Sequence, residues 1–174
     1  MNSDDRSFPE KRAGPFPEPP LSFTDREGRD VEVRAYEEGD EEALVEMYVD
    51  FDPADRAQGI PPALESRVRD WVDTLVEGLN VIAWHGDEVA GHATLVPDGD
   101  EAWELAIFVH QTYQRAGIGS KLIRALLGHG KDNGIEKVWL TVERWNRAAV
   151  GLYEDVGFET ASSESFELEM VLRI

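Results

Sequence analysis

Cysteine is absent from the 174 residues of this chain. Without a thiol the chain cannot form a disulfide, bind a metal through thiolates or use a cysteine nucleophile. Long apolar runs are also missing, since a typical one covers only residues 106–109. No segment is predicted to span a membrane, and the first thirty residues lack the apolar stretch of a signal peptide. We therefore expect a soluble cytoplasmic protein, long enough for one domain with a single core.

Positive charge is scarce. The chain carries 17 Lys plus Arg, only four of them lysines, against 36 Asp plus Glu, a net charge of −19. Such a surface repels phosphates, so a nucleic-acid binder is not expected. The acidic excess either attracts a cationic substrate through its long-range field or keeps the protein soluble in a salt-rich cell, where ions screen that field. The few lysines and the even scatter of acids favour the second reading, and we expect a halophilic source.

Proline is concentrated at the start of the chain. Residues 1–20 hold five of the nine prolines among charged residues and cannot bury enough apolar surface to become ordered, so they predict a flexible tail. Residues 21–174 predict one domain, in which Asp40 is a plausible N-cap and Pro61-Pro62 opens the second helix. Strands are expected at 21–24, 31–36, 80–84, 88–96, 101–110, 138–142 and 166–172, and helices at 40–51, 61–76, 118–127 and 146–156.

The order of these elements predicts an α/β (α+β) fold. Consecutive strands on tight turns form an antiparallel meander. The strand–helix–strand unit over residues 101–142 predicts one parallel pair, because such a crossover joins parallel neighbours. The expected sheet is therefore mixed, with helices on both faces.

The most informative segment, residues 109–120, follows a strand and opens a helix. Gly117 and Gly119 let the backbone approach a ligand, and the unpaired N–H groups of the helix's first turn make an anion site. A dinucleotide fingerprint would need glycine at position 122, which is Leu, and a P-loop would need Gly-Lys-Ser/Thr where residues 119–121 read Gly-Ser-Lys. The remaining interpretations are an ordinary tight turn and a coenzyme A pyrophosphate loop.

Two motifs favour the coenzyme A interpretation. Residues 114–119, Gln-Arg-Ala-Gly-Ile-Gly, resemble the Gln/Arg-x-x-Gly-x-Gly/Ala motif of the GNAT acetyltransferases. Residues 146–158 resemble that family's second signature, Asn-x-x-Ala-x-x-x-Tyr-x-x-x-Gly-Phe. The resemblance spans residues 21–174. It implies the GNAT fold, a mixed sheet of about six to seven strands whose one parallel pair splays around acetyl-CoA, and direct transfer of an acetyl group to a primary amine.

A narrower resemblance concerns the acceptor. Residues 26–40 and Glu104 are similar to the GNAT domain of the bacterial protein-lysine acetyltransferase Pat, which implies a protein lysine as acceptor. The loop at residues 52–62, which helps shape the acceptor site in the family, departs from that pattern. A small amine, an amino acid or a protein N-terminus therefore stays open as the acceptor. A non-catalytic acyl-CoA-binding module is a further alternative, which the presence of Glu104 and Tyr153 argues against.

Two residues are the catalytic candidates. A lysine ammonium has a reference pKa near 10.4, so neutralising it at pH 7 costs about 4–5 kcal/mol. Glu104 lies in an otherwise apolar strand and could accept that proton directly or through water. The simpler interpretation is that Glu104 only faces solvent on a half-exposed strand. His110, whose position is more typical of a loop residue, could replace Glu104 as the base. Tyr153 is either a core aromatic or the acid that protonates the departing thiolate.

By the resemblance, acetyl-CoA is the cosubstrate, and a backbone N–H near Val109 stabilises the oxyanion. Arg115 or Arg147 could meet the phosphates of coenzyme A. No metal is expected, because the histidines are scattered. The protein is expected to be a monomer or homodimer. The residues expected to bind the cosubstrate are Phe108, Val109, Gln114, Arg115, Ala116, Gly117, Ile118, Gly119, Ser120, Asn146 and Tyr153.

Overall fold

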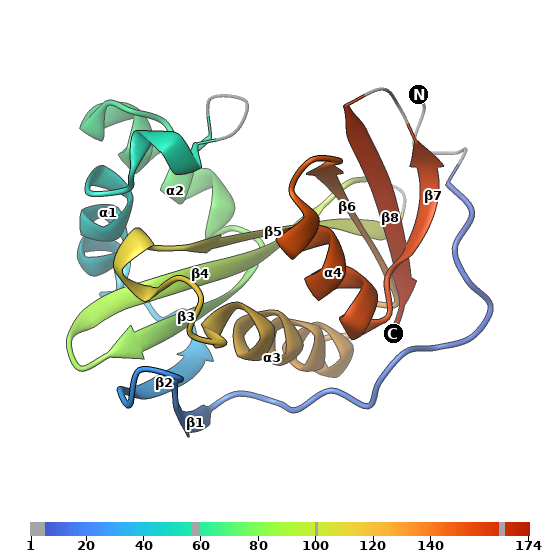
Figure 1. Ribbon diagram of the computed structural model, residues 1–174, viewed down its shortest axis with the longest axis horizontal. Helices are drawn as coiled ribbons and strands as arrows, with labels where there is room; N and C mark the ends of the chain where they lie inside the picture. The colour runs from blue at the N-terminus through green and yellow to red at the C-terminus, as the bar shows by residue number, and fades with distance from the viewer. Residues whose placement is uncertain (1–5, 57–59, 100, 164–165) are drawn as a thin grey trace.

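A computed structural model describes residues 6–56, 60–99, 101–163 and 166–174. Within them, eight strands form one sheet in the order β1-β2-β3-β4-β5-β6-β8-β7 (Figure 1). The strands are β1 Leu21–Thr24, β2 Asp30–Ala35, β3 Leu79–His85, β4 Glu88–Pro97, β5 Ala102–Val109, β6 Lys137–Glu143, β7 Glu159–Ser163 and β8 Glu167–Arg173.

The sheet is mixed, as predicted. Its neighbours pair antiparallel except β5 and β6, which are parallel and joined by a crossover helix. The β1–β2 and β3–β4 hairpins turn at Gly28 and Gly86, whose φ angles of 82° and 59° suit a residue without Cβ. The sequence did not predict β7, because its residues Glu-Thr-Ala-Ser-Ser show no apolar alternation and are mostly exposed.

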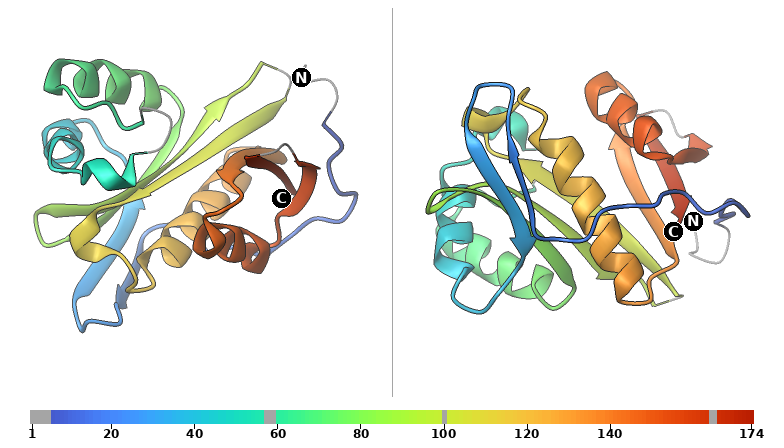
Figure 2. Two further views of the ribbon diagram at one scale, coloured as in Figure 1. Left: turned by 45° about the horizontal axis from the view of Figure 1, so that its top comes forward. Right: turned by 90° about the horizontal axis from the view of Figure 1, so that it is seen from below.

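Helices cover both faces of the sheet, which confirms the predicted layers. Helices α1 (Glu41–Val49) and α2 (Glu65–Leu75) lie on one face, and α3 (Ile118–Asp132) and α4 (Arg147–Val156) lie on the other (Figure 2). Two short 3₁₀ turns, η2 (Pro53–Asp55) and η3 (Gln111–Tyr113), complete the described elements.

The sheet separates two apolar cores. The larger lies under α3 and includes Leu105 of β5, and the smaller lies under α1 and α2. Side chains alternate along a strand, so the odd-numbered residues of β5 face α3, while Phe108 packs against the α1–α2 core. The same alternation places Glu104 on the α1–α2 face of the sheet.

Two helix ends differ from the prediction. Helix α2 begins at Glu65 rather than at Pro61-Pro62, and Leu64, which lies inside the predicted helix, is an extended N-cap that is 61% exposed. Helix α3 continues past Gly128 and Gly130 to Asp132. Close packing explains this: a Cβ on Gly130 would lie 2.9 Å from the Leu95 side chain. The low helix propensity of glycine is thereby outweighed.

The segment expected to be a flexible tail lies against the domain over residues 6–20 and runs beneath α3 to β1 (Figures 1 and 2). The Ala13 N–H donates to the Arg173 carbonyl at 2.7 Å, and the Arg173 guanidinium donates to the Pro9 carbonyl at 2.7 Å. A Cβ on Gly128 would lie 1.9 Å from the Pro17 carbonyl oxygen. Composition gave no sign of this docking because backbone groups and arginines make many of the contacts, and only Ala13 and Phe16 of the segment pack against the larger core. The first five residues lie outside the described part of the chain.

Candidate active site

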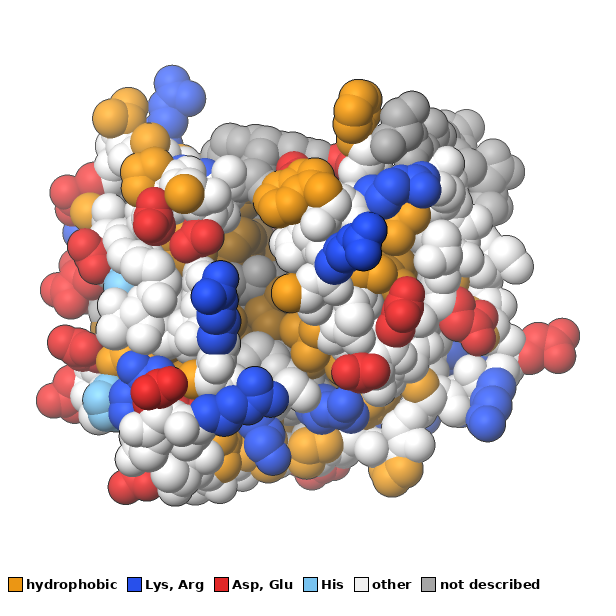
Figure 3. Space-filling view, viewed as in Figure 1, with side chains coloured by type: hydrophobic (Ala, Val, Ile, Leu, Met, Phe, Trp, Pro, Cys, Tyr) orange, Lys and Arg blue, Asp and Glu red, His pale blue; other side chains and the backbone are white. Residues whose placement is uncertain are grey.

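The parallel strands β5 and β6 part at Glu104. Their pairing covers Ala102–Glu104 against Lys137–Trp139 in the described residues. Beyond it, the edge of β5 over residues 105–109 borders an opening, which we call the β5–β6 gap. Figure 3 shows a hollow between the α1–α2 side and the α4 side of the molecule, with hydrophobic side chains on its floor.

The backbone of β5 directs hydrogen-bond donors into this gap. The His110 N–H donates to the Ala90 carbonyl at 2.9 Å, so even-numbered residues of β5 bond to β4. Successive residues of a strand direct their backbone groups to opposite edges. The N–H groups of Ile107 and Val109 therefore point towards the gap. The resemblance implied a backbone N–H near Val109 as the oxyanion donor. The N–H of Ile107, which is nearer Glu104 along the strand, is a second candidate that the sequence did not indicate.

The predicted glycine loop, residues 114–119, has a backbone conformation suited to an anion. Arg115 and Gly117 both adopt positive φ, 62° and 87°, and the loop leads into the N-terminus of α3. Such alternating backbone conformations turn successive N–H groups towards one site, and the helix dipole adds to it. For Arg115 this conformation costs on the order of 1–3 kcal/mol, a strain that typically accompanies function. A Cβ on Gly119 would lie 3.7 Å from Leu152 and 3.8 Å from Val109, which places the loop beside the gap.

Positive charge gathers around this loop despite the net charge of −19. The Arg26 Nε lies 3.6 Å from the position of a Cβ on Gly117, and the Arg26 N–H donates to the Ala116 carbonyl at 3.0 Å. Lys121 and Arg124 follow in α3. Figure 3 shows Lys and Arg side chains along the lower and left margins of the hollow. Arg26 was missed by sequence reasoning, because the β1–β2 hairpin is far from the loop in the chain.

Several predicted binding residues shape the loop itself. Gln114 donates to the Val109 carbonyl and to Asp55, both at 3.0 Å. Ala116 and Ile118 are buried, and the Ser120 hydroxyl accepts from the Arg124 guanidinium at 3.3 Å. Phe108 lies apart from this group.

The Phe108 ring belongs to an aromatic cluster on the α1–α2 face. Its centroid lies 5.5 Å from that of Tyr48 and 5.3 Å from that of Trp71. Phe108 therefore borders the gap from the α1–α2 side, on the face that also carries Glu104.

Glu104 stands at the last paired position of β5, in register with Trp139 of β6. Glu104 as a whole is exposed, yet partial desolvation of its carboxylate raises the pKa of that carboxylate. The negative charges of Asp98 and, more weakly, Glu169 raise this pKa further, while Arg6 lowers it. A carboxylate with a raised pKa is a stronger base than one in water, which suits a proton acceptor.

Tyr153 of α4 is buried, and this burial raises its pKa to about 12. Its ring contacts Phe158 edge-on at 5.9 Å between centroids. The phenol therefore keeps its proton at neutral pH. Asn146 is the N-cap of the same helix, and its side-chain oxygen accepts from the Ala149 N–H at 3.3 Å. Asn146 thus fixes the start of the helix that carries Tyr153.

His110 is engaged at both ring nitrogens. Its Nδ1 accepts from the Thr112 N–H at 3.2 Å, so the neutral ring carries its proton on Nε2, which donates to Asp50 at 2.9 Å. The ring joins the end of α1 to the end of β5, which leaves Glu104 as the stronger candidate base. No group of three or more potential metal-ligating His, Asp or Glu side chains occurs in the described residues.

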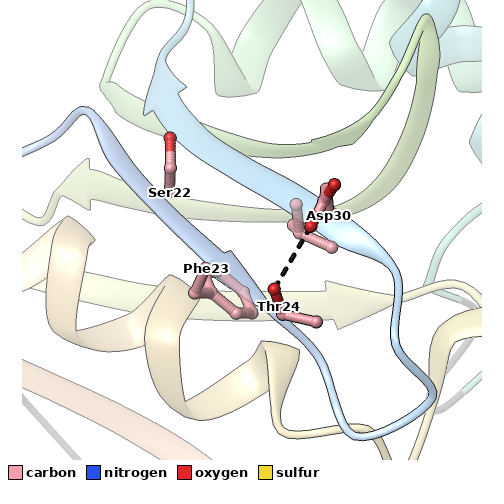
Figure 4. Close-up of a pocket in the computed structure, with 5 residues that line it drawn as sticks. Ser22, Phe23, Thr24 and Asp30 are labelled. Atoms are coloured by element: carbon pink, nitrogen blue, oxygen red, sulfur yellow. Dashed lines mark hydrogen bonds between the residues drawn. The ribbon is translucent and has the colours of Figure 1, made fainter.

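A pocket of about 320 Å³ lies on the β1–β2 hairpin, lined by Ser22, Phe23, Thr24, Asp30 and Val31 (Figure 4). The Thr24 hydroxyl donates to Asp30 at 3.2 Å beside it. It contains none of the predicted site residues and lies outside the β5–β6 gap.

Known proteins share both motif and fold with this chain. The family model described as "Acetyltransferase (GNAT) family" matches residues 41–158. The [ribosomal protein bS18]-alanine N-acetyltransferase of Escherichia coli K12 is 40% identical over 63 residues, 36% of this chain and 43% of that protein. The mycothiol acetyltransferase of Corynebacterium glutamicum ATCC 13032 is 35% identical over 81 residues, 46% of this chain and 28% of that protein. The matched segments thus span less than half the length of these relatives.

Solved structures match over more of the chain. The GNAT domain of S. lividans PAT superimposes with a TM-score of 0.75 at 18% identity, covering 89% of this chain and 97% of that domain. The yncA protein from Salmonella typhimurium, solved with acetyl-CoA, gives a TM-score of 0.65 at 20% identity over 82% of this chain and 93% of its own. The described helices of our protein include none with the length and apolar character needed to cross a membrane.

Proposed function

The chain belongs to the acetyltransferase (GNAT) family, and on that premise we propose that it transfers the acetyl group of acetyl-CoA to a primary amine at the β5–β6 gap. The observation that carries the proposal is the convergence of two features on this gap. The glycine loop offers an anion site at one end. At the other end, Glu104 stands where the strands part.

Binding follows from the backbone. The glycine loop and the N-terminus of α3 hold the pyrophosphate, with Arg26, Arg115 and Lys121 supplying positive charge. The pantetheine amides pair with the free edge of β5 as a further strand would. This arrangement brings the thioester towards Ile107 and Tyr153. Arg147, at the start of α4, remains a candidate partner for a phosphate.

The proton steps are assigned to Glu104 and Tyr153. Glu104 takes a proton from the acceptor ammonium, directly or through water, and the free amine attacks the thioester carbonyl. The oxyanion that forms is stabilised by an N–H that faces the gap, from Ile107 or Val109. As the C–S bond breaks, Tyr153 donates its proton to the thiolate, and the second proton lost by the attacking nitrogen restores the phenol, directly or through water. The acetyl group passes directly to the amine, in keeping with the absence of cysteine.

We propose a protein lysine as the acceptor and the cytoplasm of a salt-adapted cell as the setting. A second candidate is the α-amine of a protein N-terminus. It is favoured by the 40% identity over 63 residues to an enzyme named as an alanine N-acetyltransferase of ribosomal protein bS18. The two candidates differ in the group that flanks the reacting amine, a flexible alkyl chain or a peptide backbone.

Incubation with labelled acetyl-CoA and a panel of lysine peptides, peptides with N-terminal alanine and small amines tests the proposal. We expect label in one acceptor class. Gly117→Glu is the matched control, because it places a carboxylate at the pyrophosphate site and should abolish both transfer and the rise in melting temperature with acetyl-CoA. Stabilisation by acetyl-CoA without transfer to any acceptor would instead favour a non-catalytic binding module.

A further inference from the structure

Arg6 is held in a closely fitted site on the α1–α2 face of the sheet. Its guanidinium carbon lies 3.6 Å from the ring centroid of Trp139. Its Nη1 donates to Asp98 at 3.0 Å and its Nε donates to Glu169. The side chains of Arg6, Asp98 and Glu169 are only 10%, 21% and 14% exposed. Asp98, Trp139 and Glu169 together are called the cation cage below.

Three separate strands build this cage. Asp98 follows β4, Trp139 lies on β6 and Glu169 lies on β8. Carboxylates combined with an aromatic face form a strong site for an organic cation once water is excluded. The Trp139 Nε1 is buried and has no hydrogen-bond partner among the described residues, so the cage has one donor left to use.

The cage adjoins the proposed catalytic base. Trp139 is paired in register with Glu104, so both side chains lie on the same face of the sheet. The charges of Asp98, Arg6 and Glu169 all act on the Glu104 carboxylate. A cation in the cage therefore sits beside the group that receives the acceptor's proton.

The cation in the cage comes from a segment that can leave without breaking the sheet. Residues 6–20 contain no helix and no strand, and they lie outside the family match at residues 41–158. They contact the C-terminal end of the chain through separate hydrogen bonds and ion pairs, such as those of Ala13 and Arg6, rather than through a strand ladder. Ala13 and Phe16 also pack against the larger core. Without Arg6, the carboxylates of Asp98 and Glu169 would lie close to each other beside Trp139 with no cation between them, which favours binding of a cation from outside.

We propose that the cation cage is a subsite for a basic side chain of a peptide acceptor, next to the amine that is acetylated, and that Arg6 occupies it from within the chain. The inference rests on the proposed acetyl transfer, but the binding experiment below does not require transfer to occur. It predicts acceptors in which a guanidinium or ammonium group flanks the reacting amine. It also makes the N-terminal segment a competitor of the acceptor.

Calorimetry with Nα-acetyl-arginine amide tests the cage. This probe carries one guanidinium and no free amine, so neither acetyl-CoA nor turnover is needed. Arg6→Ala should bind the probe about tenfold or more tightly than the wild type, because occupancy of the cage by Arg6 lowers the apparent affinity. Lys11→Ala is the matched control, since it removes an exposed cation from the same segment and should leave the affinity unchanged.

Two further arms keep the test decisive. Asp98→Asn and Glu169→Gln, which preserve side-chain shape, should remove probe binding in the Arg6→Ala protein. The neutral citrulline analogue should not bind. The proposal is overturned if Arg6→Ala gains no affinity, if binding survives both substitutions, or if the citrulline analogue binds equally well. Each result stands whether or not the protein proves to transfer acetyl groups.

Discussion

Burial raises the pKa of Tyr153 to about 12, so its phenol stays protonated throughout the neutral range. The thiolate that leaves a thioester develops negative charge, and a nearby phenol can neutralise this charge by donating its proton. The hydroxyl of Tyr153 has no hydrogen-bond partner among the described residues, which leaves the proton free for this purpose. Tyr153 is thus suited to act as an acid.

Tyr153→Phe should therefore lower kcat by about 10²–10⁴-fold, the usual contribution of a general acid, and leave acetyl-CoA affinity unchanged. Raising the pH should not restore the rate, because the defect lies at the leaving thiolate. Tyr36→Phe, which removes a phenol next to the α1–α2 core, is the control. Steady-state kinetics and calorimetry measure both effects. A Tyr153→Phe protein with the kcat of the wild type would assign the residue to packing alone.

The buried His92 should make the folded protein less stable in acid. Burial lowers its pKa from 6.5 to about 3, and its ring lies between Tyr48 at 2.6 Å and Asn80 at 2.7 Å. Because the folded-state pKa is depressed, the stabilisation is present above pH 6.5 and is lost as the pH falls towards 3. Between pH 7 and pH 4.5, urea unfolding should show a loss of about 2–3 kcal/mol attributable to this residue.

His92→Gln, which keeps a polar group in place, is the comparison for that experiment. Its free energy of unfolding should fall less steeply with pH than that of the wild type, even if it starts lower. Parallel curves for the two proteins would show that other groups, not His92, cause the acid sensitivity.

Among single residues, contiguous signatures predicted Tyr153 and the glycine loop. Glu104 was predicted from its place in the strand before that loop, and the functional roles of all three stay predictions. Arg26 and Arg6 were not predicted, because each reaches its partner through the fold and carries no local pattern. Asn146 and Gln114 were predicted as binding residues, and their contacts add a role in shaping α4 and the loop.

At the scale of elements, the N-terminal segment and α3 depend on each other. Because Gly128 has no side chain, the Pro17 carbonyl can approach the helix closely. Elsewhere in a helix, glycine in place of alanine lowers stability by about 1 kcal/mol. The contact with the docked N-terminal segment therefore explains why glycine occupies position 128 of α3.

Gly128→Ala should consequently have opposite effects in two backgrounds. In the full chain it should lower the melting temperature, because the new Cβ collides with the Pro17 carbonyl 1.9 Å away. In a protein that lacks residues 1–20 it should be neutral or stabilising by up to about 1 kcal/mol. Gly130→Ala is the control, since its Cβ would meet Leu95 at 2.9 Å in both proteins. Equal effects of Gly128→Ala in both backgrounds would contradict the docking.

Elements with strong periodicity were predicted well, and the others were not. The parallel β5–β6 pair followed from the crossover rule and the body of α3 from apolar spacing, while α4 coincides with the second motif. Strand β7 has no alternation to detect, and the start of α2 was misplaced because a proline pair suits a turn as well as a first helical turn. The docking of residues 6–20 depends on tertiary contacts that composition does not encode.

At the scale of the whole molecule, the proposed site lies where the sheet opens between β5 and β6 into two halves that share the core under α3. One half carries α1, α2 and their aromatic core, and the other carries α4 and the C-terminal strands. Neither half holds the complete chemistry, since Glu104 comes from β5 and Tyr153 from α4. Activity should therefore require the gap between them rather than any single motif.

The pH dependence of kcat/KM for Glu104→Gln, on the best acceptor of the panel, tests this account most directly. The wild type should lose activity as the pH falls through the raised pKa of Glu104. The variant should turn over about 10²–10⁴-fold more slowly at neutral pH and recover in part as alkali neutralises more of the amine. Glu32→Gln, an exposed carboxylate on β2, should behave as the wild type. A Glu104→Gln protein with the wild-type rate and profile would contradict the account.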